Sequence, residues 1–340
     1  MAARVSVIVP VYRVEEFLPR CLKSLEDQAM FEDLEILLID DGSPDRSGEI
    51  CDEFARKHAN ARAIHRENGG VASARNAGLA AAAGDYIAFL DSDDFARADA
   101  YSTACEAAVE SGADIVVFRY VSVRDDTEVR KPPMPGEPRR IEGGEAILRS
   151  LINHRNGVFE AVWDKLFRRE LLEGLSFPPN LSCGEDAVLL AKACAKAGSA
   201  LVINDFLYFY RERPGSAMRT VTGTIPDERV RAHEEIARIA RENFPALRND
   251  AAARAHFMRL LVLNEMMGCP DYRRLPAWKR QVAALRRSLP KLLLARSKRW
   301  MPLPRKGYAA LLAAFPGLAA RLHQGRALRR KDAQCPRTSV

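Results

Sequence analysis

Hydrophobic residues in the first third of the chain follow a repeated strand–helix pattern. Continuous apolar runs rich in β-branched residues, typical of strands buried on both faces, occupy Val5 to Val11, Leu34 to Ile39 and Tyr86 to Leu90. Apolar residues recur at helical spacing in Glu15 to Gln28, as expected of a helix that buries one stripe. Repeated units of this kind predict an α/β fold, with a mostly parallel, Rossmann-like sheet and helices on both faces.

The same pattern predicts further elements and a change of character near residue 218. We expect helices at 47–58, 72–83, 98–111, 144–151 and 187–197, and strands at 62–65, 114–121 and, as one or two short strands, 201–210. From Pro226 onward the pattern is helical. We therefore expect one domain over residues 1–218 and a helical region over residues 219–340.

Two acidic clusters directly follow predicted strands. They read DDGS at residues 40–43 and DSDD at residues 91–94. Asp, Gly and Ser are ordinary turn formers, so either cluster alone is more often a turn than a site. Ligands of open parallel sheets bind beyond the carboxyl ends of the strands, and two clusters there favour function. Asp91 and Asp93 lie on the same side of an extended backbone, which suits a hard divalent cation shared with ligand phosphates.

A glycine pair lies between these clusters and opens a predicted helix. Residues 68–78 read NGGVASARNAG. Free backbone N–H groups at the helix start, together with Arg75, suit a nucleotide or its phosphates. A flexible turn before a small-residue helix packed against the sheet explains the residues equally well.

Four motifs taken in order carry a family resemblance. SVIVPVY at residues 6–12, DDGS at 40–43, the glycine and ARNAG segment at 68–78 and DSDD at 91–94 resemble the family 2 glycosyltransferases. The resemblance covers the first 100 residues densely and thins out to about Ser216. It implies the A-type glycosyltransferase fold (GT-A), a nucleotide-sugar donor with uridine as its base, Mg²⁺ or Mn²⁺ as cofactor, and inversion at the anomeric carbon. It also implies a nucleotide-binding half, residues 1–120, and an acceptor half, residues 121–218.

Individual roles follow from the resemblance, position by position. The donor would be bound by Pro10, Tyr12, Asp40, Asp41, Arg75 and Asp91. The metal would be bound by Asp93 directly, with Asp91 beside it. Trp163 and Lys165 stand in a WDKL segment on the acceptor side. No histidine stands where some relatives have a further metal ligand, and the QxxRW signature of polymerising relatives is absent, which favours addition of a single sugar.

The residues GED at 184–186 stand where the family has its catalytic base. Inversion requires a carboxylate that takes the acceptor proton while the metal stabilises the leaving diphosphate. We expect Asp186 to be this base, with Glu185 as the second candidate, although a helix-capping or first-turn acid is the ordinary interpretation of the position. The segment YRERPGS at 210–216 resembles a loop that closes over the diphosphate, where Arg211 or Arg213 would stabilise the leaving group.

Composition restricts the class of protein and its compartment. The chain has 340 residues, of which 47% are hydrophobic, which fits a soluble globular protein. Its seven cysteines are scattered and form no CxxC pair, so a reducing compartment is expected. The N-terminus does not resemble a signal peptide, and no apolar run reaches the roughly 18 residues that span a bilayer. We expect a cytoplasmic protein.

The C-terminal region is strongly basic. Residues 273–331 contain 17 Lys or Arg and no Asp or Glu, with Trp and Leu interspersed. This composition favours a peripheral contact with an anionic membrane surface at its inner face, which suits a lipid-linked saccharide acceptor in cell-surface polysaccharide synthesis. A solvated helical appendage packed on the main domain is the second interpretation, and nucleic-acid binding is the third.

The function predicted from these features is that of a metal-dependent hexosyltransferase. Two alternatives from other classes are a nucleotidyltransferase with a similar fold and a non-catalytic protein that binds nucleotide or membrane. The first lacks its glycine-rich loop with a following Arg or Lys, and the intact set Asp41, Asp91, Asp93 and Asp186 speaks against the second.

Overall fold

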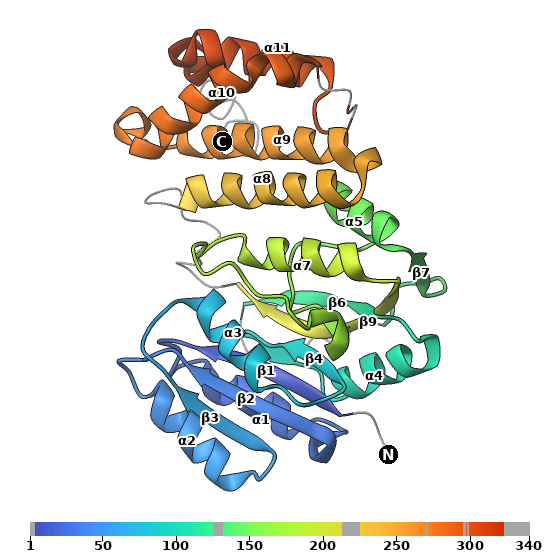
Figure 1. Ribbon diagram of the computed structural model, residues 1–340. Coiled ribbons are helices and arrows are strands. Elements are labelled where there is room, and N and C mark those ends of the chain that lie inside the picture. Colours follow the sequence, from blue (N-terminus) through green and yellow to red (C-terminus); the bar gives the residue numbers. More distant parts are fainter. Residues whose placement is uncertain are drawn as a thin grey trace, which may run out of the picture. The chain divides into compact units, whose positions relative to one another are not determined.

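The structure is a computed structural model that describes residues 4–124, 132–212, 225–269, 271–294, 297 and 299–322. The chain divides into two units, Met1–Ser216 and Ala217–Val340. The first combines a sheet with helices, and the second is built from helices (Figure 1).

A nine-stranded sheet forms the centre of the first unit, in the order β3-β2-β1-β4-β8-β6-β9-β5, with β7 paired to β9. The strands are β1 (Val5–Val11), β2 (Leu34–Asp40), β3 (Ala61–His65), β4 (Tyr86–Phe89), β5 (Phe95–Ala96), β6 (Ile115–Val123), β7 (Arg139–Glu142), β8 (Lys165–Arg168) and β9 (Ser199–Arg211). The predicted α/β class with a helical C-terminal region is confirmed.

The half of the sheet formed by β3, β2, β1 and β4 is parallel, as predicted. Val11 pairs with Asp40 and Ile8 with Phe89, so the carboxyl ends of β1, β2 and β4 lie at one edge. The acidic clusters that follow β2 and β4 therefore leave the sheet on the same side.

The other half of the sheet is mixed rather than parallel. Strand β8 runs antiparallel to both β4 and β6, while β6 and β9 are parallel. Strand β9 is a single strand of 13 residues and not one or two short ones, because its length is shared among three partners, β5, β6 and β7.

Helices cover both faces of the sheet in the first unit (Figure 1). They are α1 (Leu18–Glu26), α2 (Ser47–Lys57), α3 (Val71–Ala81), α4 (Ala100–Ser111), α5 (Gly144–Asn153), α6 (Arg169–Leu172) and α7 (Glu185–Lys196). Val5, Val7 and Val9 of β1 share one core with residues of α1, α2 and α4. Ile8 faces the opposite side and meets α3 at Gly78, since side chains alternate along a strand.

The second unit contains α8 (Ile225–Asn243), α9 (Arg248–Met266), α10 (Pro276–Leu294) and α11 (Leu303–Ala314). It has a core of its own, with contributions from all four helices. Among the residues that the structure describes, none of the helices is long and apolar enough to cross a membrane.

Gly78 allows α3 to approach β1 closely, which gives a first test. A Cβ atom at this position would lie 2.3 Å from Cγ2 of Ile8, so we expect Gly78→Ala to lower the free energy of unfolding by about 1–3 kcal/mol. Gly307→Ala is the control, because a Cβ at this position of α11 meets no atom within 4 Å. It should raise the stability by roughly 0.5–1 kcal/mol through helix propensity. Urea unfolding of the full chain measures both; a neutral Gly78→Ala would contradict the close approach.

Candidate active site

A buried arginine at the centre of the first unit binds three carboxylates. Arg75, on α3, is 3% exposed. Its Nη1 donates to Glu185 at 2.9 Å and to Asp186 at 2.7 Å, and its Nη2 donates to Asp91 at 2.8 Å. The side chain thereby joins α3, the loop after β4 and the first turn of α7. Four of the predicted site residues are brought together by this one group.

The charges in this cluster do not balance, because one cation faces three acids. Burial raises the pKa of Asp186 well above the usual range of an aspartate; Arg75 opposes this shift, while Glu185 and Asp91 add to it. The side chains of Asp91 and Asp186 are 25% and 19% exposed, whereas that of Glu185 is 9% exposed. Asp91 and Asp186 are thus the two acids of the cluster that a ligand reaches most easily.

Asp186 lies in the first turn of α7, behind Gly184 at the N-cap position. Gly184 has a φ of 88°, which is favourable only for glycine. No side chain caps this helix, so Asp186 acts as a first-turn acid near the helix dipole while its Oδ1 accepts from Arg75. Of the two ordinary roles considered for Asp186, helix cap and first-turn acid, the structure therefore leaves the first-turn acid.

Asp41 holds the glycine pair that precedes α3. Its carboxylate, 2% exposed as a residue, accepts from the N–H of Gly69 at 3.1 Å and of Gly70 at 2.7 Å. Asp40 accepts from the N–H of Ser43 and pairs with His65 at 2.9 Å. Both acids thus shape the loops that follow β2 and β3, the second of which leads into α3.

Pro10 and Tyr12 mark the end of β1 at the same edge of the sheet. Pro10 is the penultimate residue of the strand and is buried. Tyr12 follows the strand and is 44% exposed. An exposed aromatic ring beside two acid-ended strands suits a planar base or a ribose.

The acidic loop after β4 is anchored by its last residue, Asp94. Its buried carboxylate accepts from the hydroxyl of Tyr208 and from the N–H of Arg211, both at 2.7 Å. The N–H of Asp91 donates in turn to the Tyr208 hydroxyl at 3.3 Å. Tyr208 and Asp94 therefore fix the loop that presents Asp91 and Asp93 to the end of β9.

Arg211 is the last residue of β9 and is buried. Its Nε donates to the backbone carbonyl of Asp93 at 2.8 Å, and its guanidinium lies 5.2 Å from the ring centroid of Phe17. It therefore belongs to a strand end rather than to an open loop. Arg213 lies outside the described residues.

Three tyrosine rings surround the predicted acceptor-side tryptophan. Trp163 stacks on Tyr208 with ring centroids 4.5 Å apart and on Tyr210 at 5.6 Å, and it meets the edge of Tyr120 at 4.8 Å. Tyr120 is 41% exposed. Because Tyr208 also holds the acidic loop, the aromatic cluster and the loop are coupled through one side chain.

Lys165 supports this cluster from within the fold. It is fully buried, and its Nζ donates to Asp164 and to the carbonyls of Phe159 and Ala161. These bonds use the three donors of an ammonium group. Lys165 thus holds the loop that carries Trp163.

A metal ion at this site would need phosphate oxygens of a bound substrate to complete its coordination shell. Within the described part of the chain, no group of three or more His, Cys, Asp or Glu is arranged to hold a metal ion. Asp91 and Asp93 are oxygen donors on one loop, and Asp91 is already paired with Arg75. This donor set fits Mg²⁺ or Mn²⁺, which accept one or two carboxylates when phosphates and water complete the shell.

Three side chains of this site had no role assigned from the sequence: Asp94, Tyr208 and Arg66. Two weak sequence signals pointed to the first two: Asp94 belongs to the DSDD motif, and Tyr208 alternates with Tyr210 along a predicted strand. Nη1 of Arg66 lies 3.5 Å from Asp41. Nothing in the pattern of this short segment indicates that contact.

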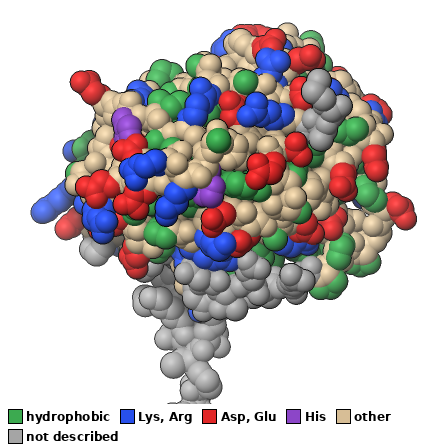
Figure 2. Space-filling view, turned by 90° about the horizontal axis from the view of Figure 1, so that it is seen from below, with side chains coloured by type: hydrophobic (Ala, Val, Ile, Leu, Met, Phe, Trp, Pro, Cys, Tyr) green, Lys and Arg blue, Asp and Glu red, His purple; other side chains and the backbone are tan. Residues whose placement is uncertain are grey.

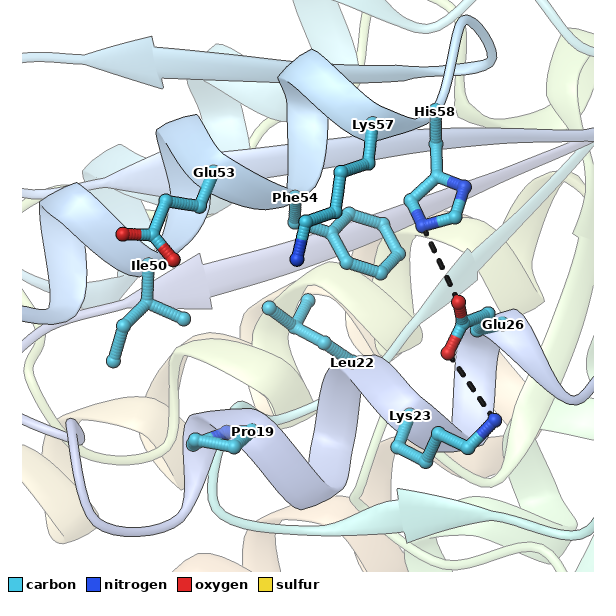
Figure 3. A pocket seen from close by; sticks show the side chains of 9 residues that line it. All are labelled: Pro19, Leu22, Lys23, Glu26, Ile50, Glu53, Phe54, Lys57 and His58. Carbon is cyan, nitrogen blue, oxygen red and sulfur yellow. Dashed lines mark ion pairs between the residues drawn. The ribbon is translucent and has the colours of Figure 1, made fainter.

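A groove lies in the first unit away from these residues. It has a volume of about 210 Å³ and is lined by Pro19, Leu22, Lys23, Glu26, Ile50, Glu53, Phe54, Lys57 and His58 of α1 and α2 and the residues beside them (Figure 3). None of these residues is a predicted site residue. Figure 2 shows acidic and basic side chains interspersed over the lower face of the molecule in Figure 1, with no patch of a single sign.

The buried arginine provides the test of this arrangement. Arg75→Met leaves three acids without their shared cation, so we expect a loss of about 3–5 kcal/mol in the free energy of unfolding. Arg62→Met is the control, because Arg62 pairs with Glu35 while its own side chain is 52% exposed; it should cost less than about 1 kcal/mol. Urea unfolding of both variants decides, and equal losses would contradict the central role of Arg75.

Comparison with known proteins identifies the family to which the chain belongs. The family model described as Glycosyl transferase family 2 matches residues 6–175. The chain is 37% identical over 218 residues to "Uncharacterized glycosyltransferase EpsJ" of Bacillus subtilis (strain 168), over 64% of this chain and 63% of that protein. It is 33% identical over 228 residues to "Glycosyltransferase GlyG" of Streptococcus pneumoniae serotype 4, over 65% of this chain and 74% of the relative. The chain thus spans less than two thirds of EpsJ.

Solved structures share the fold. S. aureus TarS 1-349 in complex with UDP-GlcNAc matches with a TM-score of 0.70 at 22% identity, over 91% of each chain. The mannosyltransferase PcManGT of Pyrobaculum calidifontis, solved with GDP-Man and Mn²⁺, matches with a TM-score of 0.53 at 18% identity, over 93% of this chain and 88% of its own. The resemblance drawn from the four motifs is confirmed: this chain belongs to glycosyl transferase family 2.

Proposed function

We propose that this glycosyltransferase moves a sugar from a UDP-sugar to an acceptor hydroxyl with inversion at the anomeric carbon. The observation that carries the proposal is the pairing of Arg75 with Asp91 on one side and with Glu185 and Asp186 on the other. It puts a pair of carboxylates beside the loop expected to hold the donor phosphates. The structure of TarS with UDP-GlcNAc supports a uridine donor.

The donor would lie across the carboxyl ends of β1, β2 and β4, in the half formed by residues 1–120. Tyr12 and Pro10 would flank the base and ribose, and Asp41 and Asp40 would line the same pocket. Asp41 already accepts two backbone N–H groups. A base that donates to Asp41 would therefore compete with the glycine pair, and the start of α3 would shift when the donor binds.

Mg²⁺ or Mn²⁺ would be held by Asp93, with Asp91 beside it, and by the diphosphate. The cation would neutralise the charge that builds up on the leaving diphosphate. The Mn²⁺ in the structure of PcManGT supports this assignment. Asp91 would then be shared between Arg75 and the donor, so Arg75 acts as a positioning residue rather than as a direct donor ligand.

Asp186 would take the proton of the acceptor hydroxyl, with Glu185 as the second candidate. Glu185 is more deeply buried than Asp186, which favours Asp186 as the group that reaches the acceptor. Arg75 orients the Asp186 carboxylate. Arg211 or Arg213 would stabilise the leaving diphosphate.

The acceptor half, residues 121–218, would bind a saccharide on the aromatic cluster of Trp163. A partly exposed Tyr120 ring next to a tryptophan suits the apolar face of a sugar ring. "Minor teichoic acid biosynthesis protein GgaB" of Bacillus subtilis (strain 168) is 31% identical over 221 residues, which supports a cell-surface polymer as the product. We propose a lipid-linked saccharide acceptor and a cytoplasmic enzyme at the inner face of the membrane, with residues 219–340 as a separate helical region.

The metal assignment predicts the behaviour of Asp93→Ala. With a panel of nucleotide-sugars and Mn²⁺, the wild type should slowly release the nucleotide from one donor. EDTA or Asp93→Ala should reduce that release by about a hundredfold or more, because the diphosphate loses its counter-charge. Release that continues in EDTA would contradict a metal-dependent reaction.

The base assignment predicts different results for two neighbouring acids. Asp186→Asn should lower kcat of transfer by about 10²–10⁴-fold with little change in donor KM, the range for loss of a general base. Glu185→Gln, the matched control, should retain most of kcat. An Asp186→Asn variant as active as the wild type would refute the assignment.

The pH dependence of transfer tests the same carboxylate independently. Because burial raises the pKa of Asp186, the rate should fall with decreasing pH at values above the ordinary aspartate pKa of about 3.9. The protonated acid cannot take the proton of the acceptor hydroxyl, so the transfer rate is lost as the pH falls through the pKa of Asp186. A rate that stays flat down to pH values near 4 would contradict a base with a raised pKa.

A further inference from the structure

Large apolar side chains are exposed mainly at the end of the second unit. Eleven such side chains are exposed in the described residues, and six of them fall between residues 293 and 322. These six are Leu293, Leu294, Leu303, Phe315, Leu318 and Leu322. Leu294 and Leu303 are 79% and 81% exposed. Several large apolar side chains exposed within one short segment mark an interaction surface more often than isolated exposed residues do.

The exposed leucines lie on a helical hairpin that is held by other contacts. Nζ of Lys306, on α11, donates to the carbonyl of Leu293 at the end of α10, at 2.7 Å. Nε of Arg286, on α10, donates to the carbonyl of Ala313 near the end of α11, also at 2.7 Å. These two bonds show that α10 and α11 run antiparallel, with Leu303 close to the end of α10.

The core of the hairpin does not use the exposed side chains. Leu285, Leu292 and Leu312 are fully buried in the core of the second unit. Leu293 and Leu294, next to one of them, face away from that core. Replacement of the exposed leucines should therefore leave the fold of the hairpin intact.

All formal charges on the hairpin are positive. Residues 273–322 contain no Asp or Glu. Apart from Asp332, the acids of the second unit precede the hairpin in sequence. Several are already paired: Asp227 with Arg280, Glu234 with Arg259 and Glu265 with Arg229. A partner that covers this surface has to be anionic and to offer an apolar phase for the leucines.

We propose that the α10–α11 hairpin docks on the anionic surface of a lipid bilayer. Leu294, Leu303 and their exposed neighbours enter the headgroup–acyl boundary, and exposed basic side chains of the hairpin, such as Arg287 and Lys291, face the anionic headgroups. The proposal rests on the proposed function, because a lipid-linked acceptor requires the enzyme to work at a membrane. A nucleic acid would match the positive charge, but it offers no apolar environment in which the six exposed side chains could be buried.

Vesicle co-sedimentation of the full chain tests the docking surface. The wild type should bind vesicles that contain phosphatidylglycerol, should bind pure phosphatidylcholine far less, and should be released by high salt. The double variant Leu294→Glu/Leu303→Glu should bind the anionic vesicles at least about tenfold more weakly. Val109→Glu is the matched control, since Val109 lies on α4 of the first unit and is 58% exposed; it should bind like the wild type.

The outcomes separate this proposal from its alternatives. Wild-type protein that ignores anionic vesicles at low salt overturns it, as does a Leu294→Glu/Leu303→Glu variant that binds as the wild type does. If the double substitution instead halves the mass of the protein in solution, the surface joins two copies of the chain, and the proposal is wrong. Equal retention of both proteins on duplex DNA, with no vesicle binding, assigns the charge to nucleic acid.

A nucleotide-release assay without vesicles tests the proposed transferase function separately from the proposed membrane docking. Nucleotide release by Leu294→Glu/Leu303→Glu should match that of the wild type, because neither leucine belongs to the site assigned in the first unit. Vesicle binding without any nucleotide release would support the docking surface while it removes the proposed function. Nucleotide release without vesicle binding would support the proposed function and contradict the docking surface.

Discussion

The contact of Arg75 with Asp91, Glu185 and Asp186 is the interaction on which the rest of the site depends. Each partner arrives on a different element, and Glu185 is 110 residues away in sequence. A buried arginine among acids is stable only while those acids remain ionised and near. The three elements are therefore constrained to one geometry, in which the proposed donor loop and the proposed base are held together.

A second constraint links the two substrate sides. Tyr208 holds Asp94 and the N–H of Asp91 through one hydroxyl, and its ring stacks on Trp163. The loop proposed to carry the metal and the aromatic cluster proposed to bind the acceptor thus share a side chain. Pre-organisation of this kind lowers the cost of aligning two substrates.

The sequence predicted the parallel half of the fold well, because β1, β2 and β4 are continuous apolar runs and turn-forming acids follow β2 and β4. It predicted the second half less well. Strand β8 has only 4 residues and begins and ends with a basic residue, so it lacks the continuous apolar run that marks β4. The burial of Lys165 and the pairing of Arg75 arise from contacts between distant segments, which local pattern does not encode. For the same reason the sequence offered Asp91, Glu185 and Asp186 as candidates but did not predict that one arginine joins them.

The anomeric configuration of the product tests the central claim most directly. With a donor that supports transfer, proton NMR of the isolated saccharide gives the configuration of the new bond. A single base opposite a metal-bound diphosphate predicts inversion relative to the donor, and Asp186→Asn should form little of that product. Retention of configuration would contradict the account, because it requires a nucleophile or a same-side attack that this arrangement of Asp91, Arg75 and Asp186 does not provide.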